Sequence, residues 1–343
     1  MPASLRDRLL DLAQEMPPLE VPADLRVRTR RRQLANVAIA TALAVVLVVV
    51  VLTGARGVLR GAPAPGVSPT PSPTASGVVA GTGTISVAGP GLDVIDVDPG
   101  APPGAKPNRL LDGRGGPYAW SPDGSRLLFI RQPSFDLWVH DADGTETRLT
   151  TDITVQDASW SPDGGRIVLS QDGEIDVMGA DGSRRRTLYR GQDAYNVDPV
   201  WSPDGSTIAF THVDRASQLW VMGSDGSDPH ALVTSVQMHE YSQNPAAWSP
   251  DGTELAFGGV TGLDLQVYVV GADGSGLRQL THDPRTALNP SWSPDGSQIA
   301  YLSTQESSGW VVYVMNADGS DPHSLEVSTT KDSTVLWHPE GGV

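Results

Sequence analysis

The stretch Trp120-Ser121-Pro122-Asp123-Gly124 is repeated along this chain. Further copies begin at Trp160, Trp201, Trp248 and Trp292, and a degenerate sixth copy is Trp337-His338-Pro339-Glu340-Gly341. Successive tryptophans are 40, 41, 47, 44 and 45 residues apart. Self-similarity at this period is the signature of a repeat architecture, so one structural unit is expected to recur along the chain.

Each repeat contains four short strand candidates. In the fifth repeat they are residues 287–292, 298–303, 309–316 and 323–327. Ser-Pro-Asp-Gly joins the first two as a type I turn, because proline presets φ at the second turn position and glycine suits the fourth. An Asp-Gly pair joins the last two, and Asp-Gly between apolar runs is a strong hairpin signal. Four antiparallel strands in a repeat of this length indicate a propeller blade.

Large apolar residues recur nine positions after the motif tryptophans, where they can pack one blade against the next. They are Phe129, Leu169, Phe210, Phe257 and Tyr301. This spacing predicts that each blade presents one bulky side chain to the core.

The two ends of the repeat region complement each other. Residues 84–88, 92–98 and 108–112 match the second, third and fourth strands of a blade, whereas residues 334–337 match a first strand. Pairing these ends in one composite blade would leave no free edge in the ring. The sequence therefore predicts an all-β, six-bladed propeller over residues 82–343, closed by N- and C-terminal strands.

The repeated Trp-Ser-Pro-Asp-Gly, followed by an apolar strand and Ala-Asp-Gly-Ser, resembles the repeat of the TolB-type β-propeller family. The resemblance covers residues 82–343. It implies a rigid extracytoplasmic disc that binds proteins or ligands on its faces. Members of that family usually have a cleaved signal and an N-terminal α/β domain, and neither is recognised in this sequence. This departure argues against a Tol-Pal role.

Charge divides the sequence into two unequal parts. Residues 1–60 hold 9 basic and 5 acidic residues, a net charge of +4, whereas residues 61–343 hold 15 basic and 35 acidic residues, a net charge of −20. The large part should repel phosphates, so no nucleic-acid partner is expected. The short part suits an anionic membrane surface. The chain has no cysteine, which excludes disulfides and thiolate metal sites.

An uncharged, apolar segment over residues 34–55 is long enough for a helix that spans about 30 Å of hydrocarbon. Five arginines lie within residues 26–32, so the positive-inside rule assigns residues 1–33 to the cytoplasm and the propeller to the outside. A cleaved signal peptide is the alternative, but the preceding segment is too long and no Ala-x-Ala site follows. We therefore expect a single-pass cell-membrane anchor, followed by a Pro/Ser/Thr-rich linker over residues 56–81.

Residues 1–16 form a predicted amphipathic helix. One face carries Leu5, Leu9, Leu12 and Met16. The helix either rests on the membrane or docks a cytoplasmic partner. In the second case the chain would be a transmembrane sensor or regulator, whereas in the first it would be a membrane-anchored binding protein.

Residues three or four positions before the motif tryptophans are the candidate binding site. The first strand of each blade lines the axis of a propeller, so these residues should ring one mouth of the central channel. They are Pro117, Asp157, Asp198, Asn244, Asn289 and Thr334, and the longest loop between blades adds His239 and Tyr241. Such a ring would bind a cation, a basic peptide tail or another polar ligand. The alternative is a water-filled channel without a specific ligand.

No catalytic or cofactor motif is recognised in the sequence. Gly-x-Ser-x-Gly and the phosphate-binding loops are missing, and the histidines have no metal-ligand spacing. The motif aspartates fit turn geometry rather than a calcium series. We expect a non-enzymatic binding or scaffold protein of the cell envelope without metal or cofactor. A hydrolase or lyase that uses Asp157, Asp198 or His239 is the remaining alternative.

Overall fold

The structure is a computed structural model, and it describes residues 84–88, 94–97, 99, 108–111, 119–191, 194–238, 246–261, 264–282, 285–305, 309–330 and 332–338. These residues belong to one compact unit, Ala75–Val343. The predicted amphipathic helix, membrane helix and linker lie outside the described residues. Within the ranges given above, no helix has the length and apolar character needed to cross a membrane.

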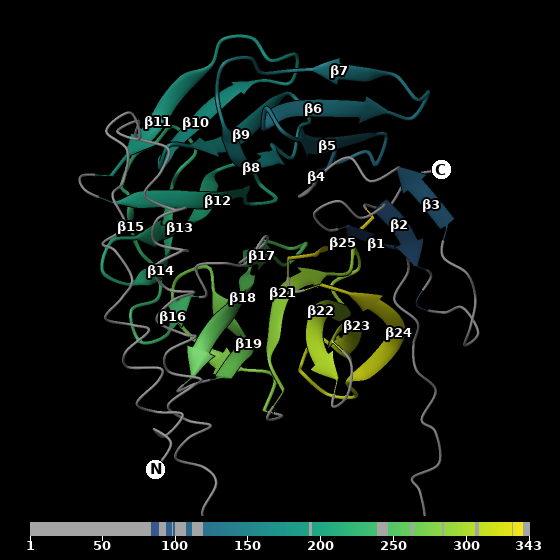
Figure 1. The fold of residues 1–343 in the computed structure, drawn as a ribbon. Coiled ribbons are helices and arrows are strands. Elements are labelled where there is room, and N and C mark those ends of the chain that lie inside the picture. The colour runs from purple at the N-terminus through teal and green to yellow at the C-terminus, as the bar shows by residue number, and fades with distance from the viewer. Residues whose placement is uncertain are drawn as a thin grey trace, which may run out of the picture. The chain divides into compact units, whose positions relative to one another are not determined.

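The described strands form six antiparallel sheets around a common centre, so the fold is an all-β propeller (Figure 1). The innermost strand of each sheet ends at a motif tryptophan. These inner strands are β4 (Ala119–Trp120), β8 (Val155–Trp160), β12 (Tyr195–Trp201), β17 (Ala246–Trp248), β21 (Ala287–Trp292) and β25 (Thr334–Trp337).

The remaining strands follow outward in each sheet. The second strands are β5 (Arg126–Arg131), β9 (Arg166–Gln171), β13 (Thr207–Val213), β18 (Glu254–Thr261), β22 (Gln298–Gln305) and β1 (Ile85–Ala88). The third strands are β6 (Asp136–Asp141), β10 (Glu174–Gly179), β14 (Ser217–Gly223), β19 (Asp264–Gly271), β23 (Gly309–Asn316) and β2 (Val94–Val97). The outer strands are β7 (Glu146–Arg148), β11 (Arg186–Arg190), β15 (His230–Ala231), β20 (Arg278–Gln279), β24 (His323–Thr329) and β3 (Asn108–Leu111). One extra strand, β16 (Gln237–Met238), pairs with β18.

Five of these sheets are each built from the consecutive strands of one repeat. The four strands predicted for the fifth repeat correspond to β21, β22, β23 and β24, with β22 and β24 each extending two residues further than predicted. Strands β21 and β23 end where predicted, just before the Ser-Pro-Asp-Gly and Asp-Gly turns, because the backbone conformation of turn residues cannot continue a ladder.

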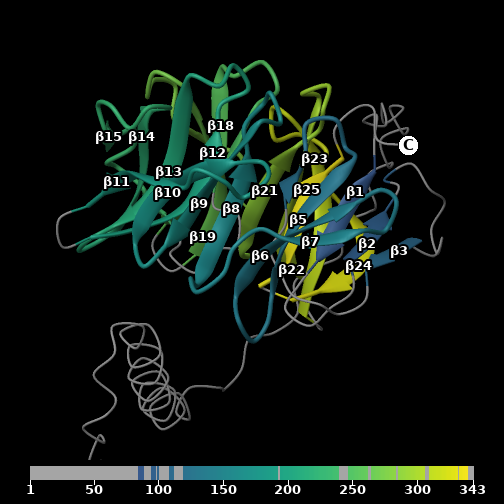
Figure 2. The ribbon, with the colours of Figure 1, turned by 90° about the horizontal axis from the view of Figure 1, so that it is seen from above.

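The sixth sheet is composite, as the complementary ends of the repeat region predicted. Its strand order is β25-β1-β2-β3. The innermost strand, β25, therefore follows the last complete repeat in the sequence, whereas the other three strands precede the first motif. Strands β25 and β1 pair antiparallel, with Ile85 opposite Trp337 and Ala88 opposite Thr334. Both views place them side by side (Figures 1 and 2). This pairing joins segments that are about 250 residues apart in the sequence.

In each complete Ser-Pro-Asp-Gly turn the serine contributes to the turn together with Pro, Asp and Gly. In the first repeat the Gly124 amide donates to the Ser121 carbonyl at 2.8 Å, which closes the turn. The Ser121 hydroxyl donates to Asp123 Oδ1 at 2.6 Å and accepts the Arg126 amide at 2.9 Å. The same serine-to-aspartate hydrogen bond recurs in the other four complete motifs, at Ser161, Ser202, Ser249 and Ser293.

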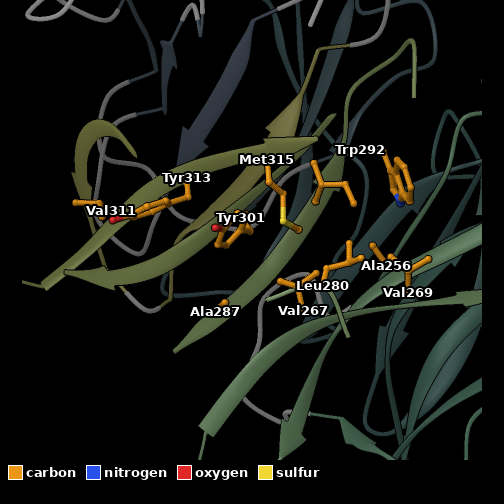
Figure 3. Packing of buried hydrophobic residues seen from close by; sticks show 11 residues of the cluster. Ala256, Val267, Val269, Leu280, Ala287, Trp292, Tyr301, Val311, Tyr313 and Met315 are labelled. Carbon is orange, nitrogen blue, oxygen red and sulfur yellow. The ribbon is translucent and has the colours of Figure 1, made fainter. Parts of the chain in front are cut away.

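The hydrophobic core lies between neighbouring sheets. Figure 3 shows one such cluster, in which Ala256, Val267 and Val269 of one sheet meet Trp292 and Tyr301 of the next. The five residues predicted to pack between blades are all buried, with exposed fractions of 0 to 4%: Phe129, Leu169, Phe210, Phe257 and Tyr301. Burial of such side chains stabilises a fold by about 1.5–3 kcal/mol each.

The glycines of two Asp-Gly turns give a stability prediction. Gly144 and Gly182 have φ values of +85° and +82°, which disfavour any residue with a Cβ. A Cβ on Gly144 would meet nothing within 4 Å, whereas a Cβ on Gly182 would lie 2.6 Å from the Leu149 carbonyl oxygen of the preceding blade. Gly144→Ala should therefore cost about 1 kcal/mol of unfolding free energy, and Gly182→Ala about 2–4 kcal/mol.

Urea unfolding of both variants tests this expectation, because the two substitutions share the backbone strain and differ only in the clash. Equal losses of stability would mean that the Asp-Gly turn does not press on the neighbouring blade.

Candidate functional site

A cavity of about 360 Å³ lies where the inner strands converge. Its wall includes residues from all six inner strands, so it lies at the centre of the propeller. Five of the six motif tryptophans contribute to it: Trp120, Trp201, Trp248, Trp292 and Trp337. The wall is therefore partly aromatic, which the sequence interpretation missed because it treated the tryptophans only as markers of the repeat.

Two of the predicted site residues meet at this cavity. Asp157 on β8 and Asp198 on β12 both line it. The Ser170 hydroxyl, on the neighbouring strand β9, donates to Asp157 Oδ2 at 3.3 Å and helps to orient the carboxylate. Two acidic side chains from adjacent blades therefore border the same space.

Two other predicted residues are buried and do not line the cavity. Asn289 on β21 is completely buried, and its Nδ2 donates to the Ser333 carbonyl at 2.7 Å. Thr334, the first residue of β25, is 3% exposed. The Asn289 side chain thus holds β21 against the segment that enters β25, and neither side chain lines the central cavity.

The remaining predicted site residues lie outside the described residues. They are Pro117, His239, Tyr241 and Asn244. His239 is also one of the three residues, with Asp157 and Asp198, that the hydrolase or lyase alternative would use. Because His239 lies outside the described residues, the arrangement of these three residues is not described.

A local backbone feature explains why Asp and Asn stand three residues before the tryptophan. Asp198 and Asn289 have φ values of +57° and +55°, and the ladder to the next strand shifts register at each of them. Asp and Asn tolerate this left-handed region better than other residues with a Cβ. At Asn289 the residue type therefore serves the backbone bulge, whereas at Asp198 it serves the bulge and also brings a carboxylate to the cavity.

The indole N–H groups of the motif tryptophans differ in whether they have a hydrogen-bond acceptor. Trp160 Nε1 donates to the Ala119 carbonyl at 3.1 Å, and Trp120 Nε1 donates to Ser86 Oγ at 3.1 Å. The buried Nε1 atoms of Trp201, Trp292 and Trp337 have no acceptor among the described residues. A buried unsatisfied N–H costs about 1–3 kcal/mol, so bound water or ligand acceptors near these donors would be favoured.

Among the described ranges, no group of three or more His, Asp or Glu side chains is placed to hold a metal ion. The wall of the central cavity offers carboxylates and aromatic faces, which suit a polar or cationic group.

A family model described as the TolB beta propeller domain matches residues 170–343, just over half of the chain. The chain belongs to this family. The TolB-type resemblance noted in the sequence is thereby confirmed, and the fold agrees with it.

Individual relatives of this TolB-type propeller share only part of their length with it. The Tol-Pal system protein TolB of Bordetella pertussis is 31% identical over 153 residues, which cover 43% of this chain and 33% of the relative. The protein TolB homolog of Chlorobium luteolum is 30% identical over 136 residues, which cover 38% of this chain and 29% of the relative. The chain thus spans about a third of the length of these two curated relatives.

Among solved structures, the crystal structure of TolB from Acinetobacter baumannii is similar in fold. It superposes with a TM-score of 0.61 at 20% identity, and the match covers 76% of this chain and 68% of that one. At this identity the similarity shows the propeller fold alone. The residues of the central cavity in the TolB-type propeller described here must therefore be interpreted from their own geometry.

Proposed function

We propose that this chain is a membrane-anchored, extracytoplasmic binding protein. Its propeller would recognise a cell-envelope protein or another polar, cationic ligand at the central cavity. The observation that carries the proposal is that Asp157 and Asp198, from adjacent blades, border one cavity of about 360 Å³. The net charge of −20 over residues 61–343 favours the approach of a cationic partner.

The cavity wall offers two complementary attractions for a cation. The side chains of Asp157 and Asp198 can accept charge-assisted hydrogen bonds from an ammonium or guanidinium group, each worth about 1.5–3 kcal/mol. Tryptophan faces attract a desolvated cation by about 0.5–2 kcal/mol. A basic peptide tail would gain from both, whereas an anionic polymer would be repelled.

The membrane anchor is part of the same proposal. It is supported by the uncharged segment over residues 34–55 and by the arginines that precede it. The Pro/Ser/Thr-rich residues 56–81 would act as an extended spacer between the bilayer and the propeller. In this arrangement the binding cavity would be held near other envelope components.

We further propose that the composite sheet acts as a sixth blade. Its Ile85 and Val335 share a buried cluster with Leu288 and Val312 of the sheet that precedes it in the ring. On its other side, Leu336 packs with the first repeat's sheet, in the cluster of Leu127 and Phe129. A sheet that packs on both neighbours in this way closes a ring without free faces.

Replacement of both cavity aspartates by asparagine tests the proposed binding site. Asparagine is preferred to alanine because Asp198 has a φ of +57°, which asparagine tolerates. The full chain in detergent micelles should bind a hexalysine peptide about tenfold or more weakly after Asp157→Asn/Asp198→Asn, because a loss of 1.4 kcal/mol is a factor of ten. Isothermal titration calorimetry in 0.15 M salt gives the affinity directly.

A charge-matched control separates a site from general electrostatic attraction. Asp143→Asn/Asp228→Asn removes two negative charges from exposed turn positions. This control should bind hexalysine within about twofold of the parent, since exposed charges are screened beyond about 8 Å in physiological salt. Equal weakening by both double variants would contradict a specific site at the central cavity.

A further inference from the structure

Two motif tryptophans are covered by an arginine from the preceding blade. The Arg126 guanidinium carbon lies 4.3 Å from the centroid of the Trp160 ring, and that of Arg166 lies 4.6 Å from the centroid of Trp201. Both arginines are the sixth residue after the motif tryptophan of their own repeat. Arg126 Nη2 also donates to the Gly164 carbonyl at 3.3 Å. The fold thus has a standard place for a guanidinium group between successive blades.

The next three repeats lack this arginine. The equivalent positions are occupied by Thr207, Glu254 and Gln298. Beside Glu254, a cavity of about 410 Å³ is open between two sheets, and its wall includes Trp292 and Gly296. Trp292 and Gly296 stand at the repeat positions of Trp160 and Gly164. The cavity therefore has the aromatic wall and the glycine that receive Arg126 elsewhere, while the arginine itself is missing.

The same cavity is strongly acidic. Asp251, Glu254, Asp295 and Asp318 line it, against a single basic residue, Arg278. Glu254 holds Arg278 through two hydrogen bonds, from Nη1 at 2.5 Å and from Nη2 at 3.0 Å. Arg278 is thereby bound at the wall and neutralised. Three carboxylates remain to attract a further cation.

These carboxylates are charged at neutral pH. The Ser249 hydroxyl lowers the pKa of Asp251, and the Ser320 side chain lowers the pKa of Asp318, in each case by hydrogen bonding to the ionised form. The pKa of Asp295 is also lowered: partial burial raises it, but hydrogen bonds from Ser293 and Ser297 outweigh that effect. The acidic character of the cavity therefore persists throughout the physiological pH range.

We propose that this cavity, which we call the Trp292 cavity, binds the guanidinium group of an arginine side chain from a partner protein. The guanidinium would stack on Trp292 as Arg126 stacks on Trp160, donate to the Gly296 carbonyl, and lie among the carboxylates of Asp251 and Asp295. A planar guanidinium suits this place better than a lysine ammonium, because it can stack and form hydrogen bonds at the same time. This second site goes beyond the function proposed for the central cavity.

The two cavities share one wall, since Trp292 lines both. Asp157 and Asp198 belong to the central cavity alone, whereas Glu254 and Asp295 belong to the Trp292 cavity alone. Variants at these residues can therefore test each site separately.

The test uses N-acetyl-arginine amide as the probe and N-acetyl-citrulline amide as its uncharged analogue. Both are titrated onto the full chain in detergent micelles, and the shift of the assigned Trp292 indole N–H resonance is followed by NMR. The arginine probe should shift this resonance in a saturable manner, and the citrulline probe should bind at least tenfold more weakly. Equal binding of the two probes would overturn the proposal.

Glu254→Arg should abolish binding, because it supplies an internal guanidinium at the place where Arg126 and Arg166 occur. Asp295→Asn should weaken binding several-fold while leaving the cavity open. The matched control is Glu174→Arg, which makes the same charge change at another glutamate paired with an arginine, Arg190. This control should bind the probe within about twofold of the parent, because its charge change is on β10, outside the Trp292 cavity, and is screened by salt.

The remaining outcomes decide between the cavities. If Glu254→Arg binds the arginine probe as tightly as the parent does, the proposal is wrong. If Asp157→Asn/Asp198→Asn abolishes the Trp292 shift, the probe occupies the central cavity and the second site is again excluded. Unchanged binding in that double variant, together with loss in Glu254→Arg, supports the Trp292 cavity whatever the central cavity binds.

Discussion

A chain that ends at Ser333 should lose at least about 5 kcal/mol of unfolding free energy and cease to unfold cooperatively. This truncation removes β25, which supplies the inner strand of the composite sheet. It deletes the buried Val335 and Trp337, with exposed fractions of 0 and 6%. Loss of a buried tryptophan alone costs about 3–5 kcal/mol, and typical domains have only about 5–15 kcal/mol in total.

The loss extends beyond β25 to β1 and to the sheet of the first repeat. Ile85, which is completely buried, would lose its partner strand and become part of an exposed edge. The His338 ring, which lies 4.1 Å from the Trp120 ring and forms a hydrogen bond of 2.8 Å with Ser86 Oγ, would also be lost. An unpaired apolar edge invites association with other chains, so the truncated protein should aggregate at micromolar concentration.

A chain that ends at His338 is the matched control, because it retains all of β25 and the contact with Trp120. Thermal unfolding followed by near-ultraviolet circular dichroism distinguishes the two. The control should melt in one sharp transition within a few degrees of the parent. A sharp transition at a similar temperature for the shorter chain would show that the ring does not depend on its composite sheet.

Much of this fold could be predicted from the sequence because its turns are chemically explicit. Pro122, Asp123 and Gly124 specify a tight turn, and the same pattern punctuates every repeat. The pairing of β25 with β1 also followed from the sequence, since each end lacked the strands that the other supplied. The role of Ser121 was missed, because a serine in a turn does not reveal that its hydroxyl will bridge a carboxylate and a distant amide.

The candidate site was harder to predict, because side-chain direction depends on local backbone conformation. Alternation along a strand predicts one direction for Asp157, Asp198 and Asn289, yet only the first two line the cavity. Bulges shift the register of β8, β12 and β21 near these residues, and a bulge is not visible in composition or spacing. A usable signal was present for the second cavity: the position six residues after the motif tryptophan changes from Arg126 and Arg166 to Glu254.

Replacing Arg148 by methionine should destabilise the protein by about 3 kcal/mol, because it leaves a buried carboxylate without its cation. Asp136 on β6 is only 2% exposed, and its Oδ2 accepts a hydrogen bond of 2.6 Å from Arg148 Nη2. Arg148 Nε also donates to the Thr150 carbonyl at 2.9 Å. Methionine has a similar length but donates no hydrogen bond, so the charge of Asp136 would remain buried and uncompensated.

Two comparisons isolate the cause of this loss. Arg148→Met/Asp136→Asn should recover more than half of the lost stability, since a buried neutral amide costs far less than a buried charge. Arg190→Met breaks an ion pair whose arginine side chain is 69% exposed, and it should cost at most about 1 kcal/mol. Urea unfolding of all three variants at pH 7 provides the values. If Arg148→Met and Arg190→Met cost the same, burial of Asp136 does not set the strength of its pairing, and β6 must be held to β7 by its ladder and apolar contacts instead.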